Sequence, residues 1–214
     1  MKTWLITGCS SGFGRNLAET LLSEGEQVIV TARKPKTIQH FAKNYPLTAL
    51  CLRLDVTKKD TIDATVNAAI EKFGKIDVLI NNAGYCLRGA VEECTEEEIY
   101  AEFNTNFFGA VRMIQAVLPH MRKAGIGAII NYSSIAALDT SAGSAFYGAA
   151  KCALEGLSCG LRKEVEPLGI KVMVVEPGPF KTDFFDRSID INPNRIAAYD
   201  DTANKRKVKI SDLS

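Results

Sequence analysis

The sequence contains no long apolar run and no strong excess of charge of either sign. No stretch approaches the ~18 apolar residues that a membrane-spanning helix requires. The 26 basic and 25 acidic residues leave a formal charge of +1, so no field favours nucleic acid or an anionic membrane. The apolar run in MKTWLITG is too short for a secretory signal. These absences favour a cytoplasmic protein without a membrane span.

The six cysteines form no C-x-x-C pair, and their spacing matches neither a zinc site nor a disulfide framework. Buried thiols in a reducing compartment are the expected state, and no metal site is predicted. The chain also shows no linker, internal repeat or low-complexity segment. Its 214 residues fit one domain, with a core at 1–178 and a partial substrate loop at 179–214.

Short apolar runs alternate with longer helical patterns along the chain. Runs such as QVIVTA and IKVMVVEPG are mostly uninterrupted by polar residues, which is typical of strands buried on both faces of a parallel sheet. The alternation predicts an α/β fold, a doubly wound Rossmann-type sheet in three α-β-α layers. The predicted strands lie within residues 4–7, 27–32, 47–56, 76–84, 127–134 and 170–178.

Helix signals lie between these runs. TKKD at 57–60 and TEEE at 95–98 resemble capping boxes and predict two helix starts. The segment from Ala145 to Pro167 predicts one long helix. After Pro177 apolar residues become fewer, and only loop and short helix are predicted there.

A glycine-rich stretch, TGCSSGFG, joins the first predicted strand to a helix. In that position Gly8 allows a tight exit from the strand, Gly12 clears the path of a pyrophosphate, and Gly14 lets the helix pack close to the sheet. The spacing is not that of a Walker loop, since no Gly-Lys-Ser/Thr follows. For the glycines alone, a purely structural turn is the alternative.

Arg33 follows the second predicted strand, where folds that prefer NAD carry an acid. An acid repels a 2′-phosphate, whereas a guanidinium binds it with charge-assisted hydrogen bonds of about 1.5–3 kcal/mol each. Arg33 therefore predicts NADP(H) in preference to NAD(H). The alternative is an arginine that merely faces solvent.

Tyr147 and Lys151 are four residues apart on the long predicted helix, so they share one face. A free tyrosine has a pKa of about 10 and is a poor base at neutral pH. A lysine cation ~4 Å away contributes about 4 kcal/mol at an effective dielectric of about 20. That energy lowers the phenol pKa by up to about three units and makes the pair an acid–base device.

These features occur together with further motifs in a fixed order: LDVT (54–57), NNAG (81–84), NTNFFGA (104–110), NYSS (131–134), YGAAK (147–151) and EPGPFKT (176–182). With TGCSSGFG, they span residues 7–182 and resemble the short-chain dehydrogenase/reductase family in its single-domain form. The TAR after the second strand and PGPFKTDFF resemble the branch of 17β-hydroxysteroid and retinol dehydrogenases and related bacterial oxidoreductases.

The resemblance implies a role for each matching residue. Tyr147 is the proton donor or acceptor, Lys151 holds the nicotinamide ribose, and Ser134, rather than Ser133, binds the substrate oxygen. Asn106 anchors a water that links Lys151 to solvent. The implied cofactor contacts are Gly8, Ser10, Ser11, Gly12, Phe13, Gly14, Arg33, Asp55, Val56, Asn82, Ala83, Gly84, Tyr147, Lys151, Pro177, Gly178 and Thr182.

Some of these residues also have purely structural readings. Asn82 to Gly84 can merely turn the chain, Asn106 can cap a helix kink, and Pro177 and Gly178 can form a plain strand exit. The family also implies a homo-oligomer, a further helix and a seventh strand. Neither that helix nor that strand is evident before Ser214, so the sequence is either a fragment or lacks the last strand.

The predicted function is that of an NADP(H)-dependent oxidoreductase interconverting a carbonyl and an alcohol, with a small-molecule substrate. Mostly apolar candidates for the substrate pocket favour an apolar substrate: Tyr85, Cys86, Leu87, Leu138, Phe180, Phe184 and Phe185. The alternative is an impaired or truncated NADP(H)-binding sensor or scaffold, which the retained Ser134, Tyr147 and Lys151 argue against. A P-loop or flavodoxin-like protein is a third reading, and the missing lysine after the glycines disfavours it.

Overall fold

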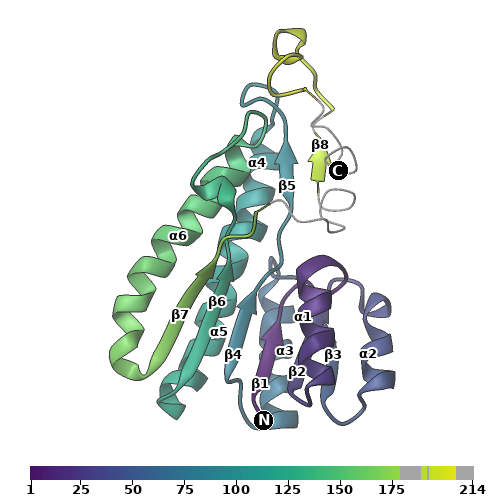
Figure 1. Cartoon of the computed structure of the whole chain (residues 1–214), viewed down its shortest axis with the longest axis vertical. Coiled ribbons are helices and arrows are strands. Elements are labelled where there is room, and N and C mark those ends of the chain that lie inside the picture. Colours follow the sequence, from purple (N-terminus) through teal and green to yellow (C-terminus); the bar gives the residue numbers. More distant parts are fainter. Residues whose placement is uncertain (179–188, 192, 206–214) are drawn as a thin grey trace.

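The computed structural model describes residues 1–178, 189–191 and 193–205. A parallel sheet of six strands, in the order β3-β2-β1-β4-β6-β7, forms the centre of the molecule (Figure 1). All six predicted strands and the doubly wound α/β fold are confirmed. The strands are β1 (Thr3–Ile6), β2 (Gln27–Ala32), β3 (Ala49–Arg53), β4 (Val78–Asn81), β6 (Gly127–Tyr132) and β7 (Ile170–Val175).

Helices cover both faces of the sheet, because successive strand residues point to opposite sides. Ile6, Val28 and Ile80 belong to a core shared with α1 (Gly12–Ser23) and α2 (Gln39–Asn44). Their strand neighbours Leu5, Ile29 and Leu79 belong to a second core on the opposite face. That core is shared with α3 (Lys59–Phe73), α5 (Gly109–Ala124) and α6 (Ala145–Val165). The three-layer prediction is therefore confirmed.

The strand order reverses beside β1, which has β2 on one side and β4 on the other. The chain after β1 therefore turns away from the chain after β4, which leaves a crevice at the carboxyl ends of the strands. Among the described residues, β7 pairs within the sheet only with β6. Within the same part of the chain, no helix is long and apolar enough to cross a membrane.

A second, two-stranded sheet stands above that crevice (Figure 1). It pairs β5 (Cys86–Arg88) with β8 (Ile189–Ile191) in parallel. The prediction of no further strand after Pro177 was wrong at β8, because its pairing partner lies about a hundred positions away and leaves no local pattern. The short helix predicted in the tail is present as η5 (Ala197–Tyr199).

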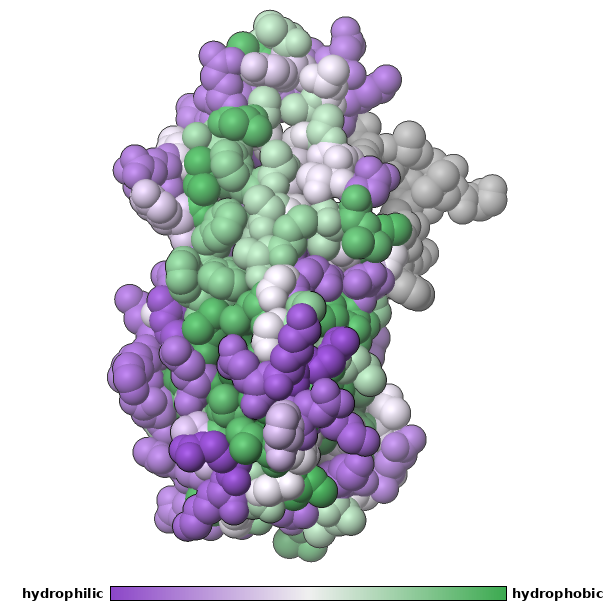
Figure 2. Space-filling view, turned by 90° about the vertical axis from the view of Figure 1, so that its left-hand side faces the viewer, coloured by the Kyte–Doolittle hydropathy of each residue, from purple (hydrophilic) through white to green (hydrophobic). Residues whose placement is uncertain are grey.

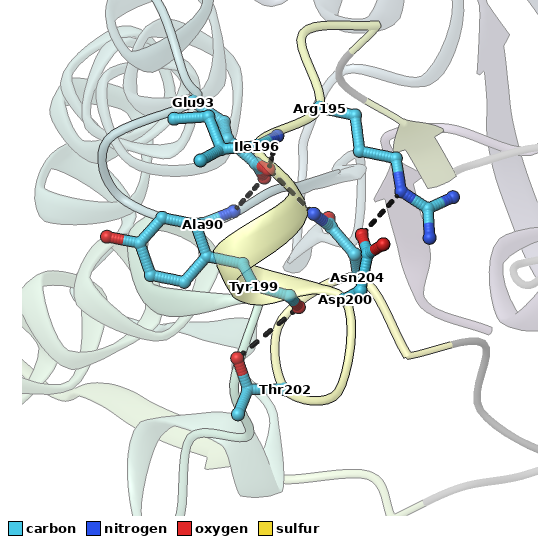
Figure 3. A network of polar contacts seen from close by, with 8 residues as sticks. All are labelled: Ala90, Glu93, Arg195, Ile196, Tyr199, Asp200, Thr202 and Asn204. Carbon is cyan, nitrogen blue, oxygen red and sulfur yellow. Dashed lines mark hydrogen bonds and ion pairs between the residues drawn. The ribbon is translucent and has the colours of Figure 1, made fainter.

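The Glu93 carboxylate makes most of the contacts that attach residues 193–205 to the loop after β5 (Figure 3), and the Tyr199 hydroxyl adds a bond to Glu92. The Glu93 oxygens accept hydrogen bonds from the Ile196 N–H at 2.8 Å, the Asn204 side-chain amide at 2.6 Å and the Ala90 N–H at 2.7 Å. These bonds lower the pKa of Glu93. The segment is therefore tied to the body by an ionised, buried side chain.

The two predicted capping boxes have different outcomes. Thr95 caps α4 (Glu96–Phe103) in a full capping box with Glu98, as predicted. The box at 57–60 was wrong, because the Thr57 hydroxyl donates to the Asp55 carboxylate at 2.7 Å instead. The helix α3 begins at Lys59, two residues after Thr57, and its N-cap residue Lys58 makes no side-chain cap.

The remaining short elements are η1 (Pro35–Thr37), η2 (Asn104–Phe108), η3 (Ile135–Ala137) and η4 (Glu166–Leu168), of which η2 is one π-helical turn.

Candidate functional site

A cleft of about 410 Å³ opens at the crevice where the six strands end. Each strand contributes the residues that follow it, from Gly8 after β1 to Pro177 and Gly178 after β7. Parallel strands bring all their carboxyl ends to one edge, so segments distant in the sequence meet there. The predicted functional residues therefore lie in one place.

The glycine turn after β1 has a backbone conformation and a packing that disfavour larger side chains. Gly8 and Gly12 have φ angles of +76° and +57°, a left-handed conformation that glycine adopts without strain. A Cβ at Gly14 would lie 2.5 Å from Asn82 Nδ2 and 2.6 Å from the Gly8 carbonyl oxygen. The turn is thus tightly packed, and α1 lies close to the end of β4.

Asn82, predicted to line the cofactor cleft, also braces this turn. Its side-chain amide donates to the Thr7 carbonyl at 2.8 Å and to the Gly8 carbonyl at 3.2 Å. The Thr7 hydroxyl accepts from the backbone N–H groups of Asn82 and Ala83, both at 2.9 Å. The ends of β1 and β4 are therefore locked together directly beneath the turn.

The N-terminus of α1 fits an anionic group. Ser11 makes no side-chain cap, and the first turn contains no acidic residue. The backbone N–H groups of a first helical turn have no partner inside the helix, and they attract negative charge. Gly12 and Phe13 belong to this turn and line the cleft. The residues present therefore suit a dinucleotide phosphate.

Arg33 and Asp55 line the far end of the cleft, after β2 and β3. Burial alone raises the pKa of Asp55, but two hydrogen bonds from Thr57 and the Arg33 charge lower it overall. Asp55 is thus held as a carboxylate within the electrostatic reach of the guanidinium. This end of the cleft presents an exposed cation beside a fixed anion.

Tyr147, Ser134 and Lys151 meet at the opposite part of the cleft. The Tyr147 phenol is hydrogen-bonded to the Ser134 side chain. The Lys151 ammonium lies 5.6 Å from the centre of the Tyr147 ring and donates to the Tyr132 carbonyl at 2.7 Å. The Ser133 hydroxyl, the less favoured candidate, is buried and has no hydrogen-bond partner among the described residues.

The predicted lowering of the Tyr147 pKa was wrong for this structure. Burial raises the pKa of Tyr147 to about 12, and the Ser134 hydrogen bond offsets only part of that rise. Burial also lowers the pKa of Lys151 to about 8. Removal of both groups from water therefore outweighs the attraction on which the prediction rested. Near neutral pH the phenol is protonated and the amine still carries its charge.

Asn106 lies behind the cleft, in the π-helical turn η2. Its side chain accepts from the Tyr85 N–H at 3.0 Å and donates to the Tyr85 carbonyl at 2.7 Å. A Cβ at Gly84 would lie 2.8 Å from Asn106 Oδ1 and 3.7 Å from Lys151 Nζ. Asn106 and Lys151 thus converge at a glycine that leaves the space between them open.

Nearly all the predicted site residues line the cleft. Gly14 and Asn106 support it from behind, and Thr182 lies outside the described residues, as do Phe180, Phe184 and Phe185. Leu87 is buried away from the cleft, and Leu138 is exposed and does not line it. The predicted residues that line it are Gly8, Ser10, Ser11, Gly12, Phe13, Arg33, Asp55, Val56, Asn82, Ala83, Gly84, Tyr85, Cys86, Ser134, Tyr147, Lys151, Pro177 and Gly178.

Sequence reasoning missed several residues of the substrate end and one buried acid. Glu102, on α4, is fully buried and touches Asn106, yet it lies within a run of glutamates that resembles a solvated helix face. A signal was available, since Glu102 lies one helical turn before Asn106. The cleft residues that were not predicted include Arg88, Tyr132, Ser141, Ser144 and Ile189.

Comparison with known proteins agrees with this geometry. The family model of the short chain dehydrogenases matches residues 2–191. The chain belongs to the short-chain dehydrogenase/reductase family. A 3-ketodihydrosphingosine reductase of Bacteroides thetaiotaomicron is 47% identical over 182 residues, which cover 85% of this chain and 65% of that protein. The oxidoreductase calM of Penicillium decumbens is 41% identical over 190 residues, 85% of this chain and 62% of its own length.

Solved structures of the family share the fold. A short-chain dehydrogenase from Streptomyces avermitilis superimposes with a TM-score of 0.90 at 41% identity, over 95% of this chain and 76% of the other. A 3-ketoacyl-(acyl-carrier-protein) reductase from Brucella melitensis, solved with NADH, gives 0.82 at 28% identity, over 86% and 78%. The chain spans slightly less than two thirds of the two curated relatives described above.

We expect Gly14→Ala to destabilise the fold by about 1–3 kcal/mol, as overpacking does, and to weaken cofactor binding. The added methyl group meets the Gly8 carbonyl oxygen, which is backbone and cannot move aside freely. Thermal unfolding and titration with NADPH measure the two effects. Asn16→Ala is the control, because Asn16 is an exposed position of the same helix. Equal stability of the two variants would contradict the tight packing of the turn.

Proposed function

We propose that the chain is an NADP(H)-dependent oxidoreductase that interconverts a carbonyl and an alcohol, with Tyr147 as the proton donor or acceptor. This proposal rests chiefly on the position of the Tyr147 phenol. It is hydrogen-bonded to Ser134 and lies beside the Lys151 ammonium, in the same cleft as the glycine turn. When bound, the nicotinamide cofactor supplies or takes up the hydride. Residues 1–178 then form the cofactor and catalytic part, and 179–214 belong to the substrate loop.

The protein's own residues supply the binding and the proton. Ser134 donates a hydrogen bond to the substrate oxygen, and Tyr147 protonates that oxygen during reduction. A phenol with a pKa of about 12 is protonated at neutral pH, which suits the reductive direction. Lys151 holds the cofactor ribose, and Asn106 holds a water through which the proton is replaced from solvent. Oxidation runs the same path in reverse and needs a more alkaline solution.

The phosphate-binding part of the cleft supports NADP(H) as the cofactor. The N-terminus of α1, with the glycine turn before it, suits the pyrophosphate. Arg33 is exposed at the end of β2 and lines the cleft, which supports a contact to a 2′-phosphate, and its charge reaches the Asp55 carboxylate. No acidic residue directly follows β2, which reads Ala32, Arg33, Lys34.

A keto compound with an apolar body is the proposed substrate. Tyr85, Cys86 and Ile189 line the part of the cleft formed by the small sheet. Two relatives are named as reductases of 3-keto compounds, which supports a ketone in preference to an aldehyde.

The second candidate function, a cofactor-binding sensor or scaffold, predicts NADPH binding without turnover on any carbonyl.

We also propose a homo-oligomer that forms through α6. Its exposed positions from Ala145 to Gly160 are small and uncharged, whereas Arg162, Lys163 and Glu164 are exposed in its last turn. Figure 2 views the side of the molecule that carries α6, and shows hydrophobic surface across the middle and more hydrophilic surface below. The exposed small positions are Ala145, Ala149, Cys152, Gly156, Cys159 and Gly160.

Tyr147→Phe is expected to lower turnover to below a few per cent of the wild-type rate, because the phenylalanine ring has no proton to give. NADPH affinity is expected to stay nearly unchanged, since the ring keeps its packing. Absorbance of the nicotinamide during reduction of apolar ketones, and fluorescence titration with NADPH, provide the two measurements. Tyr100→Phe is the control, on a tyrosine 64% exposed on α4. Retained turnover in Tyr147→Phe would refute the role of the phenol.

Arg33→Gln is expected to reduce the preference for NADPH over NADH by about ten- to a hundredfold, the equivalent of one charge-assisted hydrogen bond of about 1.5–3 kcal/mol. The ratio of kcat/KM for the two cofactors measures it. Lys34→Gln removes a neighbouring exposed charge that does not line the cleft, so the ratio is expected to stay unchanged. A wild-type preference for NADH would overturn the assignment.

Gly156→Glu is expected to shift the protein toward the monomer, because it places a charge within the apolar face of α6. A side chain at this position meets nothing within 4 Å of its Cβ, so the fold itself tolerates the change. Sedimentation velocity measures the assembly. Asn67→Glu adds the same charge at an exposed position of α3 and serves as the control. A wild-type protein that sediments as a monomer would exclude the proposal.

A further inference from the structure

Glu102 is a carboxylate in an unusual place, since it is fully buried and is the buried residue of α4. An isolated buried carboxylate costs several kcal/mol unless hydrogen bonds and an opposite charge compensate it. Its Oε1 atom accepts from the Leu87 N–H at 3.0 Å and from the Asn106 side-chain amide at 3.4 Å. Both donors are neutral, so they leave the negative charge to be balanced by another group.

A buried cation, Lys151, lies on the neighbouring helix α6. Lys151 is 5% exposed, and α4 and α6 pack against each other. Burial lowers the pKa of Lys151, and the Glu102 charge is the largest influence in the opposite direction. The Glu102 charge therefore favours the charged form of Lys151.

The other titratable groups around this pair come from three elements. Cys86 of β5 and Glu155 of α6 also raise the pKa of Lys151, each less than Glu102 does. Tyr147 lies on α6, as Lys151 does. Burial raises the pKa of Tyr147, and the charges of Cys86 and Glu102 add to that rise. Cys94, before α4, has its pKa raised to about 11 by burial and by the nearby glutamates, Glu102 included. Glu102 is thus the principal counter-charge of Lys151.

The same carboxylate also contacts the Asn106 amide. Asn106 Nδ2 donates to the Tyr85 carbonyl and to Glu102 Oε1, which leaves Oδ1 to accept from the Tyr85 N–H and to point toward Gly84. The Tyr85 backbone sets the orientation of that amide, and Glu102, a pure acceptor, favours the same orientation, since the flipped form would place oxygen against oxygen. Glu102 therefore acts on both members of the proton path.

We propose that Glu102 is the positioning residue of this proton path: its buried carboxylate, together with the Tyr85 backbone, holds the Asn106 amide, and it provides the counter-charge that keeps Lys151 protonated at neutral pH. The inference rests on the proposed oxidoreductase function. Glu102 itself does not line the cleft, so it would act through Asn106 and Lys151.

Glu102→Gln tests the proposal, because it removes the charge and keeps both the length and an oxygen for the Leu87 N–H. The Lys151 pKa, about 8 in the wild type, is expected to fall by one unit or more, a tenfold loss of proton affinity. NMR titration of ¹³C-labelled lysine side chains measures it, with the Lys151 signal assigned by its loss in Lys151→Met. The alkaline limit of kcat/KM is expected to move down with it.

Two further variants separate the charge from the packing. Glu155→Gln removes the weaker charge, without contact to Asn106, and is expected to shift the Lys151 pKa less. Glu102→Asp keeps the charge and is expected to restore the Lys151 pKa even where turnover stays low. A Glu102→Gln protein with a lower melting temperature and an unchanged Lys151 pKa would show a merely structural role and overturn the proposal.

The unmodified protein provides an independent test that needs no folded variant. The side-chain carboxyl carbon of Glu102 must show the ¹³C chemical shift of an ionised carboxylate at pH 7, and a protonated Glu102 would overturn the proposal. These NMR measurements do not depend on turnover. Failure to reduce any carbonyl would therefore overturn the proposed function and leave the Glu102 result standing on its own.

Discussion

The hydrogen bond from Lys151 to the Tyr132 carbonyl joins the long helix α6 to the end of β6. It helps to set the position of α6 along the sheet. Tyr147, one helical turn before Lys151, thereby lies beside Ser134 in the segment that follows β6. The bond requires an ammonium deep in the protein, which burial opposes. The Tyr132 carbonyl accepts a hydrogen bond from that cation, and the charges of Glu102 and Glu155 favour its charged form. The whole polar cluster is thus organised around one buried charge that the fold must accommodate.

The parallel sheet explains why so much of the fold and the site is predictable from the sequence. Each of the six strands is a local apolar run, and most of the functional motifs directly follow one of them, so their order along the chain determines their meeting at one edge. The motifs with Asn106 and Tyr147 lie on helices instead. Gly8, Asp55 and Asn82 needed no knowledge of long-range contacts. The family resemblance rests on the same motifs, and the match over residues 2–191 confirms it.

The errors arose where a residue's partner is distant or its burial is invisible in the sequence. β8 is three residues long, and its pairing partner β5 lies about a hundred positions earlier in the sequence. Thr57 has the composition of a helix cap, but the Asp55 carboxylate competes for its hydroxyl. The pKa of Tyr147 depends on how much water surrounds it, which no spacing reveals. Glu102 differs from its exposed neighbours only through the packing of α4 on α6.

The attachment of residues 193–205 has an evolutionary consequence. Glu93 holds that segment through one backbone N–H and one amide at its two ends. Because the first donor is main chain, that bond survives substitution of Ile196, whereas the bonds of Asn204 to Glu93 and of Tyr199 to Glu92 depend on those side chains. A lineage can therefore vary the remaining exposed positions of this segment, which do not line the cleft, while the segment keeps its attachment.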